Sequence, residues 1–224
     1  MIDWSPIWLS IQLSLLTTLI LLVVSIPLAY WLTHTRRRIK PVIETIVSMP
    51  IVLPPTVLGF YLLMAFSPNY AFGQWLNELL GVQFVFSFTG LVIASLIYSL
   101  PFMVNPIQSG LTSLPKGLSE ASLVLGKTRL QTLWFIELPN IRRALLTGIV
   151  LTFAHTIGEF GVVMMIGGSI PGETKVASIA IYEKVELLDY AAANTYSLIL
   201  IGVTFPLILA VYLYNRKGEN SLFK

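Results

Sequence analysis

Few side chains in this sequence could take part in chemistry. It contains no Cys and only two His residues, His34 and His155, which excludes disulfides, thiolate nucleophiles and thiolate metal sites. His155 and Glu159 are four residues apart and would share one face of a helix. Two ligands leave a tetrahedral site half empty, and no His-Glu-x-x-His pattern is present. We therefore expect no metal site, and the pair either braces buried helices or acts at a gate.

The sequence also lacks the patterns of common nucleotide-binding and hydrolytic sites. It has no Gly-x-x-x-x-Gly-Lys-Ser/Thr run to surround ATP phosphates and no Gly-x-Ser-x-Gly. An intramembrane hydrolase would need a nucleophile with a base or a pair of carboxylates, whereas Glu159 is the only carboxylate deep within an apolar stretch. We expect a non-catalytic chain that binds no cofactor itself.

The elements that position these residues follow from an apolar composition. Of the 224 residues, 55% are hydrophobic and 11% are charged, with a mean hydropathy of +0.80, whereas soluble domains carry roughly 25% charged residues. A helix needs about 20 mostly apolar residues to cross a bilayer. The sequence therefore predicts an all-α polytopic membrane protein with five spans. The spans are residues 8–32, 42–66, 89–108, 144–166 and 193–214.

Basic residues predict the orientation of these spans. Twelve of the 14 Lys and Arg residues lie after the first span, between the third and fourth spans, or in the C-terminal tail. Cytoplasmic loops carry the excess of Lys and Arg, so we expect the N-terminus outside and the C-terminus inside. The run Arg36–Lys40 directly follows a span, which indicates a topology anchor rather than a nucleic-acid site. The twelve residues are Arg36, Arg37, Arg38, Lys40, Lys116, Lys127, Arg129, Arg142, Arg143, Arg216, Lys217 and Lys224.

The second span contains a cluster of helix-breaking residues, Pro50, Pro54 and Pro55, with Thr56 and Gly59 close behind. Each Pro removes a backbone donor and obstructs a carbonyl one turn earlier. Breaks within a span occur where protein or a water-filled cavity satisfies the backbone. A single Pro would indicate a packing kink, but this cluster favours an interrupted helix that lines a cavity.

The segment between the third and fourth spans predicts two short helices. Helix-forming residues lead up to Gly126, which suits the left-handed position that ends a helix. Thr128 and Gln131 form a capping box for a second helix, and Pro139 follows it. Residues 123–125, Leu-Val-Leu, give the segment an apolar flank, on which we expect a soluble partner to dock.

That segment resembles the EAA loop of the permeases of ABC importers, whose pattern is Glu-Ala-Ala, three residues, Gly, nine residues, Ile, one residue, Leu-Pro. The matching residues are Glu120, Ala121, Gly126, Ile136, Leu138 and Pro139, with Ser122 at the third position. The resemblance implies one permease domain over residues 1–224, with a coupling loop at residues 111–139. The loop's short helix would insert into a groove of an ATPase subunit. The implied coupling residues are Ser119, Glu120, Ala121, Ser122 and Gly126.

Two further stretches resemble the molybdate and sulfate branch of these permeases. Residues 50–59 are similar to its proline-rich second span, and residues 158–161, Gly-Glu-Phe-Gly, and 170–174, Ile-Pro-Gly-Glu-Thr, are similar to the molybdate branch. Sulfate permeases share the first of these two motifs and differ around the second. The resemblance implies the type I ABC importer permease fold and import of molybdate, with sulfate or tungstate as alternatives. A passive channel would leave the coupling loop without a role.

The resemblance also implies a set of partners in the inner membrane. These are a second copy of this chain, two copies of an ABC ATPase that hold ATP and Mg, and a periplasmic or lipid-anchored molybdate-binding protein. The acidic outer segment, residues 173–189, could dock the binding protein by charge complementarity. A simply solvated segment is the alternative.

A divalent oxyanion would need a path through spans that contain no Lys or Arg. We expect neutral donors such as Ser99, together with backbone groups freed near the prolines, to line this path. Weak contacts would allow the ion to leave. The candidate path and gate residues are Pro54, Pro55, Thr56, Gly59, Thr152, Gly158, Glu159, Phe160 and Gly161.

Overall fold

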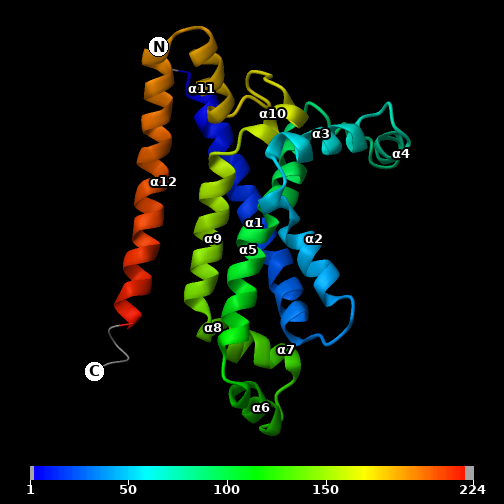
Figure 1. Cartoon of the computed structure of the whole chain (residues 1–224), viewed down its shortest axis with the longest axis vertical. Helices are drawn as coiled ribbons and strands as arrows, with labels where there is room; N and C mark the ends of the chain where they lie inside the picture. Colours follow the sequence, from blue (N-terminus) through cyan, green and yellow to red (C-terminus); the bar gives the residue numbers. More distant parts are fainter. Residues whose placement is uncertain (1–2, 220–224) are drawn as a thin grey trace.

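The computed structural model describes residues 3–219, and every regular element in this range is helical (Figure 1). Three helices are long and apolar enough to cross a membrane, and two bent helix pairs bring the number of spans to five. The prediction of an all-α protein with five spans is confirmed. The elements are α1 (Ser5–His34), α2 (Lys40–Val52), α3 (Pro55–Phe66), α4 (Ala71–Leu80), α5 (Phe88–Ser113), α6 (Lys116–Val124), α7 (Arg129–Thr132), the π-helix η1 (Leu133–Glu137), α8 (Leu138–Asn140), α9 (Arg142–Ile157), α10 (Gly161–Gly167), α11 (Ala177–Glu186) and α12 (Tyr190–Glu219).

The second span is broken between α2 and α3, which meet at 113°. Leu53 is extended, with ψ 136°, the conformation favoured before a proline. Pro54 and Pro55 lack the N–H groups that would continue α2. Pro55 instead occupies the first turn of α3, where no intrahelical donor is needed. The interruption predicted from the proline cluster is therefore confirmed.

The fourth span is also broken, although the sequence was interpreted as one continuous helix over residues 144–166. The helix α9 ends at Ile157, α10 begins at Gly161, and the two meet at 56°. No proline marks this break. Glycine disfavours a helix by about 1 kcal/mol without forbidding it, so Gly158 and Gly161 alone did not reveal the interruption. The prediction of a continuous fourth span was wrong.

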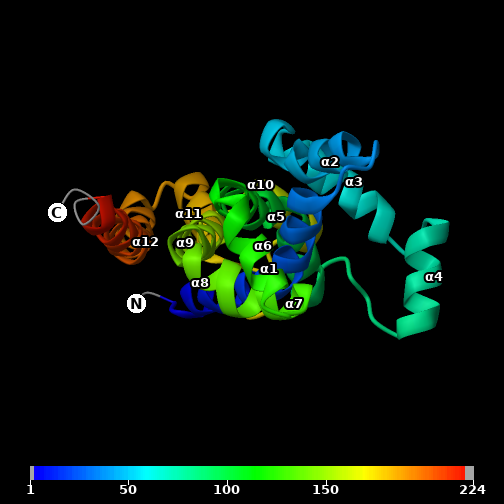
Figure 2. The ribbon, with the colours of Figure 1, turned by 90° about the horizontal axis from the view of Figure 1, so that it is seen from below.

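The helices α1, α5 and α9 form the centre of the bundle (Figure 2). Towards the cytoplasmic end, apolar side chains such as Leu32, Met103 and Ile107 form one buried cluster. Towards the outer end, residues such as Leu13 and Val162 form a second cluster. These side chains are 0–1% exposed. Burial of this kind is worth roughly 1.5–3 kcal/mol for each large apolar side chain, and it fixes the frame that carries both helix breaks.

Two parts of the chain stand at the edges of this bundle. The helix α12 lies to one side against α9 and α11, whereas α2, α3 and α4 lie to the other side (Figures 1 and 2). Their outward side chains are apolar and exposed, for example Val52 at 84% and Phe205 at 62%. Such faces are suited to contact with lipid or with another membrane protein.

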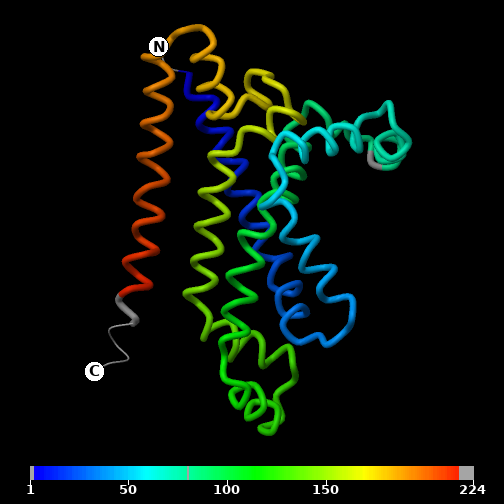
Figure 3. The backbone as a smooth tube through the Cα atoms, viewed as in Figure 1, coloured from blue at the N-terminus to red at the C-terminus, as the bar shows by residue number. Residues whose placement is uncertain are grey.

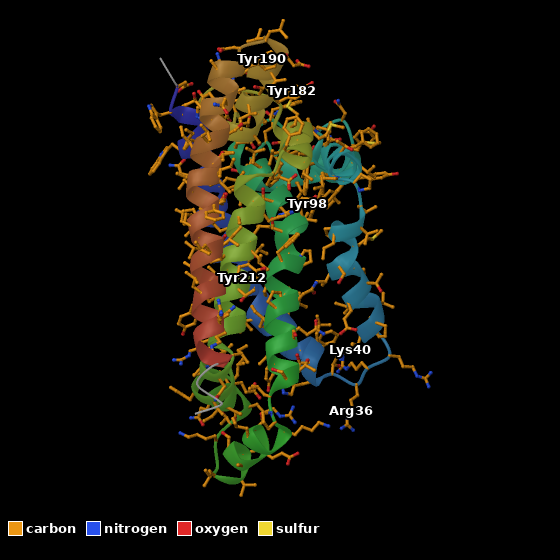
Figure 4. The ribbon with its side chains drawn as sticks, turned by 60° about the vertical axis from the view of Figure 1, so that its left-hand side comes forward. Arg36, Lys40, Tyr98, Tyr182, Tyr190 and Tyr212 are labelled. Atoms are coloured by element: carbon orange, nitrogen blue, oxygen red, sulfur yellow. The ribbon has the colours of Figure 1, made fainter. Side chains whose placement is uncertain are left out.

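The two ends of the bundle differ in charge, as predicted. The traced chain begins at one end of the long axis, and α12 runs towards the other end (Figure 3). Arg36 and Lys40 lie near the end that carries α6 and α7, whereas Tyr182 and Tyr190 lie at the opposite end (Figure 4). Lys224, counted among the cytoplasmic basic residues, lies outside the described residues. The loop end is therefore the cytoplasmic end, because it carries the basic segments.

Candidate functional site

The two helix breaks pack directly against each other, because α3 lies on α10. A Cβ atom placed on Gly161 would lie 2.6 Å from the Pro55 Cβ and 3.3 Å from the Thr56 backbone nitrogen. A Cβ on Gly59 would lie 2.8 Å from the Met165 Cβ. The distances of 2.6 Å and 2.8 Å are too short for a real side chain, so these two glycines allow the backbones of α3 and α10 to approach closely. Four of the predicted gate residues, Pro55, Thr56, Gly59 and Gly161, are thus brought together.

Glu159 lies in the break between α9 and α10, not on a helix. Its Oε1 atom accepts a hydrogen bond from the Val162 backbone N–H at 3.1 Å. Its carbonyl oxygen accepts one from the Ser178 hydroxyl at 2.5 Å. The carboxylate is buried, at 6% exposure. Glu159 therefore caps the first turn of α10 and connects it to α11. The sequence did not reveal the contact with Ser178.

His155 faces a different set of partners on α5. Its Nδ1 atom is 3.0 Å from the Ser99 Oγ, and its ring stacks on Phe102 with centroids 3.9 Å apart. Ser99 also shares a hydrogen bond of 2.9 Å with the Thr156 hydroxyl. The prediction that His155 and Glu159 share one helical face was wrong, because α9 ends at Ile157. His155 braces α9 to α5, whereas Glu159 braces α10 to α11.

The remaining path candidates differ in exposure. Thr152 and Ser99 are 0% and 1% exposed in the interior of the bundle, so their hydroxyls face helix packing rather than an open surface. Pro54 and Thr56 are exposed on the outer side of α3, and Gly158 is exposed at the end of α9. Phe160 packs on Tyr182 of α11, with ring centroids 5.0 Å apart. The structure therefore groups the candidates around the two breaks but leaves Thr152 apart from them.

The Ile-Pro-Gly-Glu-Thr stretch closes the outer end of α10. The Thr174 hydroxyl, fully buried, donates to the Gly167 carbonyl at 2.7 Å and accepts from the Ile170 N–H at 3.0 Å. Gly168 and Gly172 have positive φ angles of 62° and 78°, which glycine adopts at no steric cost. The motif is thus a locked turn that fixes where α10 ends.

Charges in the outer segment pair with one another. Glu183 forms an ion pair with Lys175 and accepts a hydrogen bond from the Ser169 hydroxyl. Burial alone would raise the pKa of Glu183, but the Lys175 and Ser169 hydrogen bonds lower it below its ordinary value. Asp189 pairs with Lys184 at 3.3 Å. The Tyr182 hydroxyl donates to Glu186 at 2.6 Å. Three of the four carboxylates in residues 173–189 therefore have a partner within that segment.

The predicted coupling loop, residues 111–139, projects from the cytoplasmic end of the bundle (Figure 1). Gly126 has φ 84°, and the Thr128–Gln131 capping box starts α7, so both local predictions are confirmed. The loop proper begins after Ser113, because α5 extends to that residue. The prediction that Pro139 follows the second helix was wrong, because the π-helix η1 carries the helical chain into α8, which contains Pro139.

The predicted coupling residues divide into an outward and an inward set. Glu120, Ala121 and Gly126 are exposed, next to an apolar surface in which Val124 and Leu125 are 87% and 81% exposed. The inward set, Ser119 and Ser122, holds α6 onto the rest of the loop. Ser122 contacts the Thr132 hydroxyl at 3.0 Å, and the Ser119 hydroxyl donates to the Glu137 Oε1 at 2.7 Å. Sequence reasoning missed Glu137, although a carboxylate within an apolar run could have signalled it.

Comparison with known proteins agrees with this arrangement. The model of the family "Binding-protein-dependent transport system inner membrane component" matches residues 8–219. The chain belongs to this family. Its place among inner membrane components of transport systems accounts for the five spans.

Two individual relatives show which transport permeases this chain is similar to. The chain is 41% identical to the molybdenum transport system permease protein ModB of Azotobacter vinelandii, over 96% of this chain and 95% of that protein. It is 33% identical to the sulfate transport system permease protein CysT of Synechocystis, over 80% of this chain and 63% of that protein. Both relatives are named as permeases, in keeping with a transport component rather than an enzyme.

A chain in a solved structure of the MetNI methionine ABC transporter has the same fold as the present chain. It superposes with a TM-score of 0.73 at 16% sequence identity, covering 95% of this chain and 94% of that chain. The fold is therefore that of a type I ABC importer permease, as the resemblance to this class of permeases implied.

Proposed function

We propose that this chain is the membrane-spanning permease subunit of an ATP-driven importer that moves molybdate into the cytoplasm. The observation that carries the proposal is the 41% identity to the Azotobacter ModB protein over almost the full length of both chains. The sulfate permease of Synechocystis is less similar and is matched over a smaller share of its length. Sulfate and tungstate remain the alternative substrates, because all three ions are divalent tetrahedral oxyanions.

The energy for transport comes from a separate ABC ATPase, since this sequence has no phosphate-binding loop of its own. ATP and Mg are bound by that partner, and this chain is non-catalytic and holds no cofactor. The exposed apolar surface of α6, with Val124 and Leu125, supports docking in a groove of the ATPase. Apolar side chains that are exposed on the isolated chain in this way are typical of a surface that a partner covers. Two ATPase copies would serve two permease copies.

A homodimer follows from the position of the candidate path residues. Pro54 and Thr56 are exposed on the surface of the single chain, so a path along them needs a second wall. A second copy of this chain, related by twofold symmetry, would supply the same residues from the opposite side. The two copies would then enclose a path between the helix breaks.

The enclosed path would bind molybdate weakly. The described basic side chains lie towards the two ends of the molecule, and the apolar cores of the five spans, residues 8–32, 42–66, 89–108, 144–166 and 193–214, contain no Lys or Arg. The neutral donors on the exposed side of the break would be the hydroxyl and the backbone N–H of Thr56, since the next two N–H groups donate to the Pro54 carbonyl. Weak, fixed donors suit a path that the ion must leave, so substrate selection would belong mainly to the periplasmic or lipid-anchored binding protein.

Alternating access would use the contact between the two helix breaks as its gate. Closure of the ATPase dimer moves the coupling loops, and the spans then rock between inward-open and outward-open states. A ligand or partner shifts such an equilibrium only by its different affinity for the two states. Gly161 of α10 lies close against α3, and Gly59 of α3 lies close against α10. Because these contacts leave little free space, this region would be the narrow, rigid part of the gate.

Co-purification tests the assignment to an ABC importer. The tagged wild-type chain, extracted in mild detergent, should retain an ATPase subunit that carries a phosphate-binding loop. Val124→Asp should abolish retention, because a charge would be desolvated in the groove. Val185→Asp is the matched control, because Val185 is an exposed valine of α11, outside the spans and at the opposite end from the loop. Failure of the wild-type chain to retain any ATPase would overturn the proposal.

A gene deletion tests the substrate. Loss of this chain should lower cellular molybdenum when molybdate is supplied in trace amounts, with sulfate uptake unchanged. Reduced sulfate uptake with normal molybdenum content would move the assignment to the sulfate branch.

A further inference from the structure

Glu137 is a buried carboxylate at the base of the coupling loop, with 2% exposure. It is the last residue of the π-helix η1. The same Oε1 atom accepts the Ser119 hydroxyl of α6 at 2.7 Å and lies 3.7 Å from the Nε2 atom of His34, near the end of α1. One carboxylate oxygen therefore touches both the coupling helix and the first span.

The His34 ring is held in the orientation that this contact needs. Its Nδ1 atom lies 2.9 Å from the Tyr30 carbonyl oxygen, and the ring packs on the Tyr30 ring with centroids 4.2 Å apart. These two contacts turn the Nε2 atom towards Glu137. Because the Tyr30 carbonyl can only accept, the Nδ1 atom of His34 carries a proton, and its Nε2 atom is a donor towards Glu137 in the imidazolium form.

The two halves of the coupling loop are attached to the bundle in different ways. Leu133, the first residue of η1, and Leu138, the residue after it, are buried in the apolar cluster near the cytoplasmic end. The only buried residue of α6 is Ser122, and the side-chain hydrogen bonds recorded for α6 are those from Ser119 and Ser122 to the second half of the loop. The helix that meets the ATPase is thus connected through two hydroxyl contacts rather than through an apolar core.

Apolar packing between α6 and α1 is limited at this place. An open cleft of about 460 Å³ is lined on one side by Tyr30 and His34 of α1 and on the other by Ser119, Glu120 and Leu123 of α6. Glu137 also lines this cleft. Solvent-accessible space separates α6 from α1 within this cleft. The polar contacts of Glu137 therefore connect the two helices, and a displacement of α6 can reach α1 through them.

We propose that Glu137 is a positioning residue that transmits the motion of the coupling helix α6 to the first span α1, through Ser119 on one side and His34 on the other. This inference rests on the proposed function, because it assumes that α6 is moved by an ATPase. It goes beyond that function by naming a residue outside the ATPase contact surface that sets how much transport each ATP hydrolysis produces.

The test measures molybdate transported per ATP hydrolysed, with the complete importer in proteoliposomes and the binding protein enclosed on the appropriate side. Glu137→Ala removes both contacts. Glu137→Gln keeps an amide oxygen that can accept from Ser119 but removes the charge facing His34. We expect retained assembly and ATPase activity, with transport per ATP reduced about fivefold or more in Glu137→Ala and less in Glu137→Gln. Glu78→Gln, an exposed carboxylate that contacts Gln74 on its own helix, is the matched control and should leave the ratio unchanged.

Ser119→Ala provides an independent arm should Glu137→Ala fail to assemble. Ser119→Ala should also lower the amount of molybdate transported per ATP hydrolysed. In the double variant Ser119→Ala with Glu137→Gln, this ratio should be reduced by less than the product of the two single reductions, because both residues act through one contact. An unchanged ratio in assembled Glu137→Gln and Ser119→Ala importers would overturn the inference. A wild-type importer that moves no molybdate with ATP would instead count against the proposed function.

Discussion

Gly161 and Pro55 lie in contact where the two broken spans cross, at a distance that leaves no room for a side chain on residue 161. One residue begins α10 and the other begins α3, so each is the first residue after a break. The contact joins two interruptions that are more than 100 residues apart in the chain. It makes the interrupted backbones a single packed unit and locates the candidate gate.

Gly161→Ala should destabilise the protein and reduce transport. Its Cβ would lie 2.6 Å from the Pro55 Cβ, and the proline ring cannot rotate away. Overpacking of this kind costs about 1–3 kcal/mol, which should lower the thermal unfolding temperature in detergent. Gly202→Ala is the matched control, because no atom lies within 4 Å of the added Cβ on α12. Equal unfolding temperatures for the two variants would contradict the packing described for the breaks.

Glu159→Ala should destabilise the break between α9 and α10 by about 0.5–2 kcal/mol, the usual effect of losing a helix-capping side chain. The Val162 N–H would lose its acceptor. Glu159→Gln should stay close to the wild type, because its amide oxygen can accept the same hydrogen bond. Thermal unfolding of both variants checks the capping role, and a Gln variant as unstable as the Ala variant would show that charge matters instead.

The outer segment should loosen in acid through Glu183. Its pKa is lowered in the folded protein, so its ion pair with Lys175 contributes stability above the ordinary glutamate pKa. That contribution disappears as the pH falls through the lowered value. The protection of the α11 amides from hydrogen exchange, relative to their intrinsic exchange rates at each pH, should therefore fall below about pH 4. Glu183→Gln should show low protection already at pH 7 and a smaller change on acidification; identical protection profiles would exclude this contribution.

Labelling of single cysteines tests the orientation, since the sequence contains no Cys. Asn69→Cys, in the exposed segment between α3 and α4, should react with a membrane-impermeant maleimide in intact cells. Gly117→Cys, exposed on α6, should react only after the membrane is opened. The reverse pattern would invert the topology inferred from the basic residues.

The features predicted correctly from sequence are those with local causes. The Pro54–Pro55 pair removes donors wherever it stands, and the Thr128–Gln131 capping box closes within one helical turn, so both could be recognised without a structure. The five spans likewise depend only on the order of apolar residues along the chain.

The features that were missed depend on contacts between distant segments. The break after Ile157 was hidden because glycine permits a break without requiring one, and this error placed His155 and Glu159 on one face. Glu137 is 103 positions from His34 in the numbering, and no periodicity links the two. Thr152 carries a polar group at a span position, yet only the packed structure shows it to be buried in the bundle.

The most direct test of the account is ATP-driven uptake of labelled molybdate into proteoliposomes that contain this chain, its ATPase and the cognate binding protein. We predict accumulation that requires ATP, that tungstate reduces by competition, and that excess sulfate leaves largely unchanged. Uptake of molybdate without ATP would indicate a channel. Sulfate accumulation without molybdate accumulation would contradict the assigned substrate.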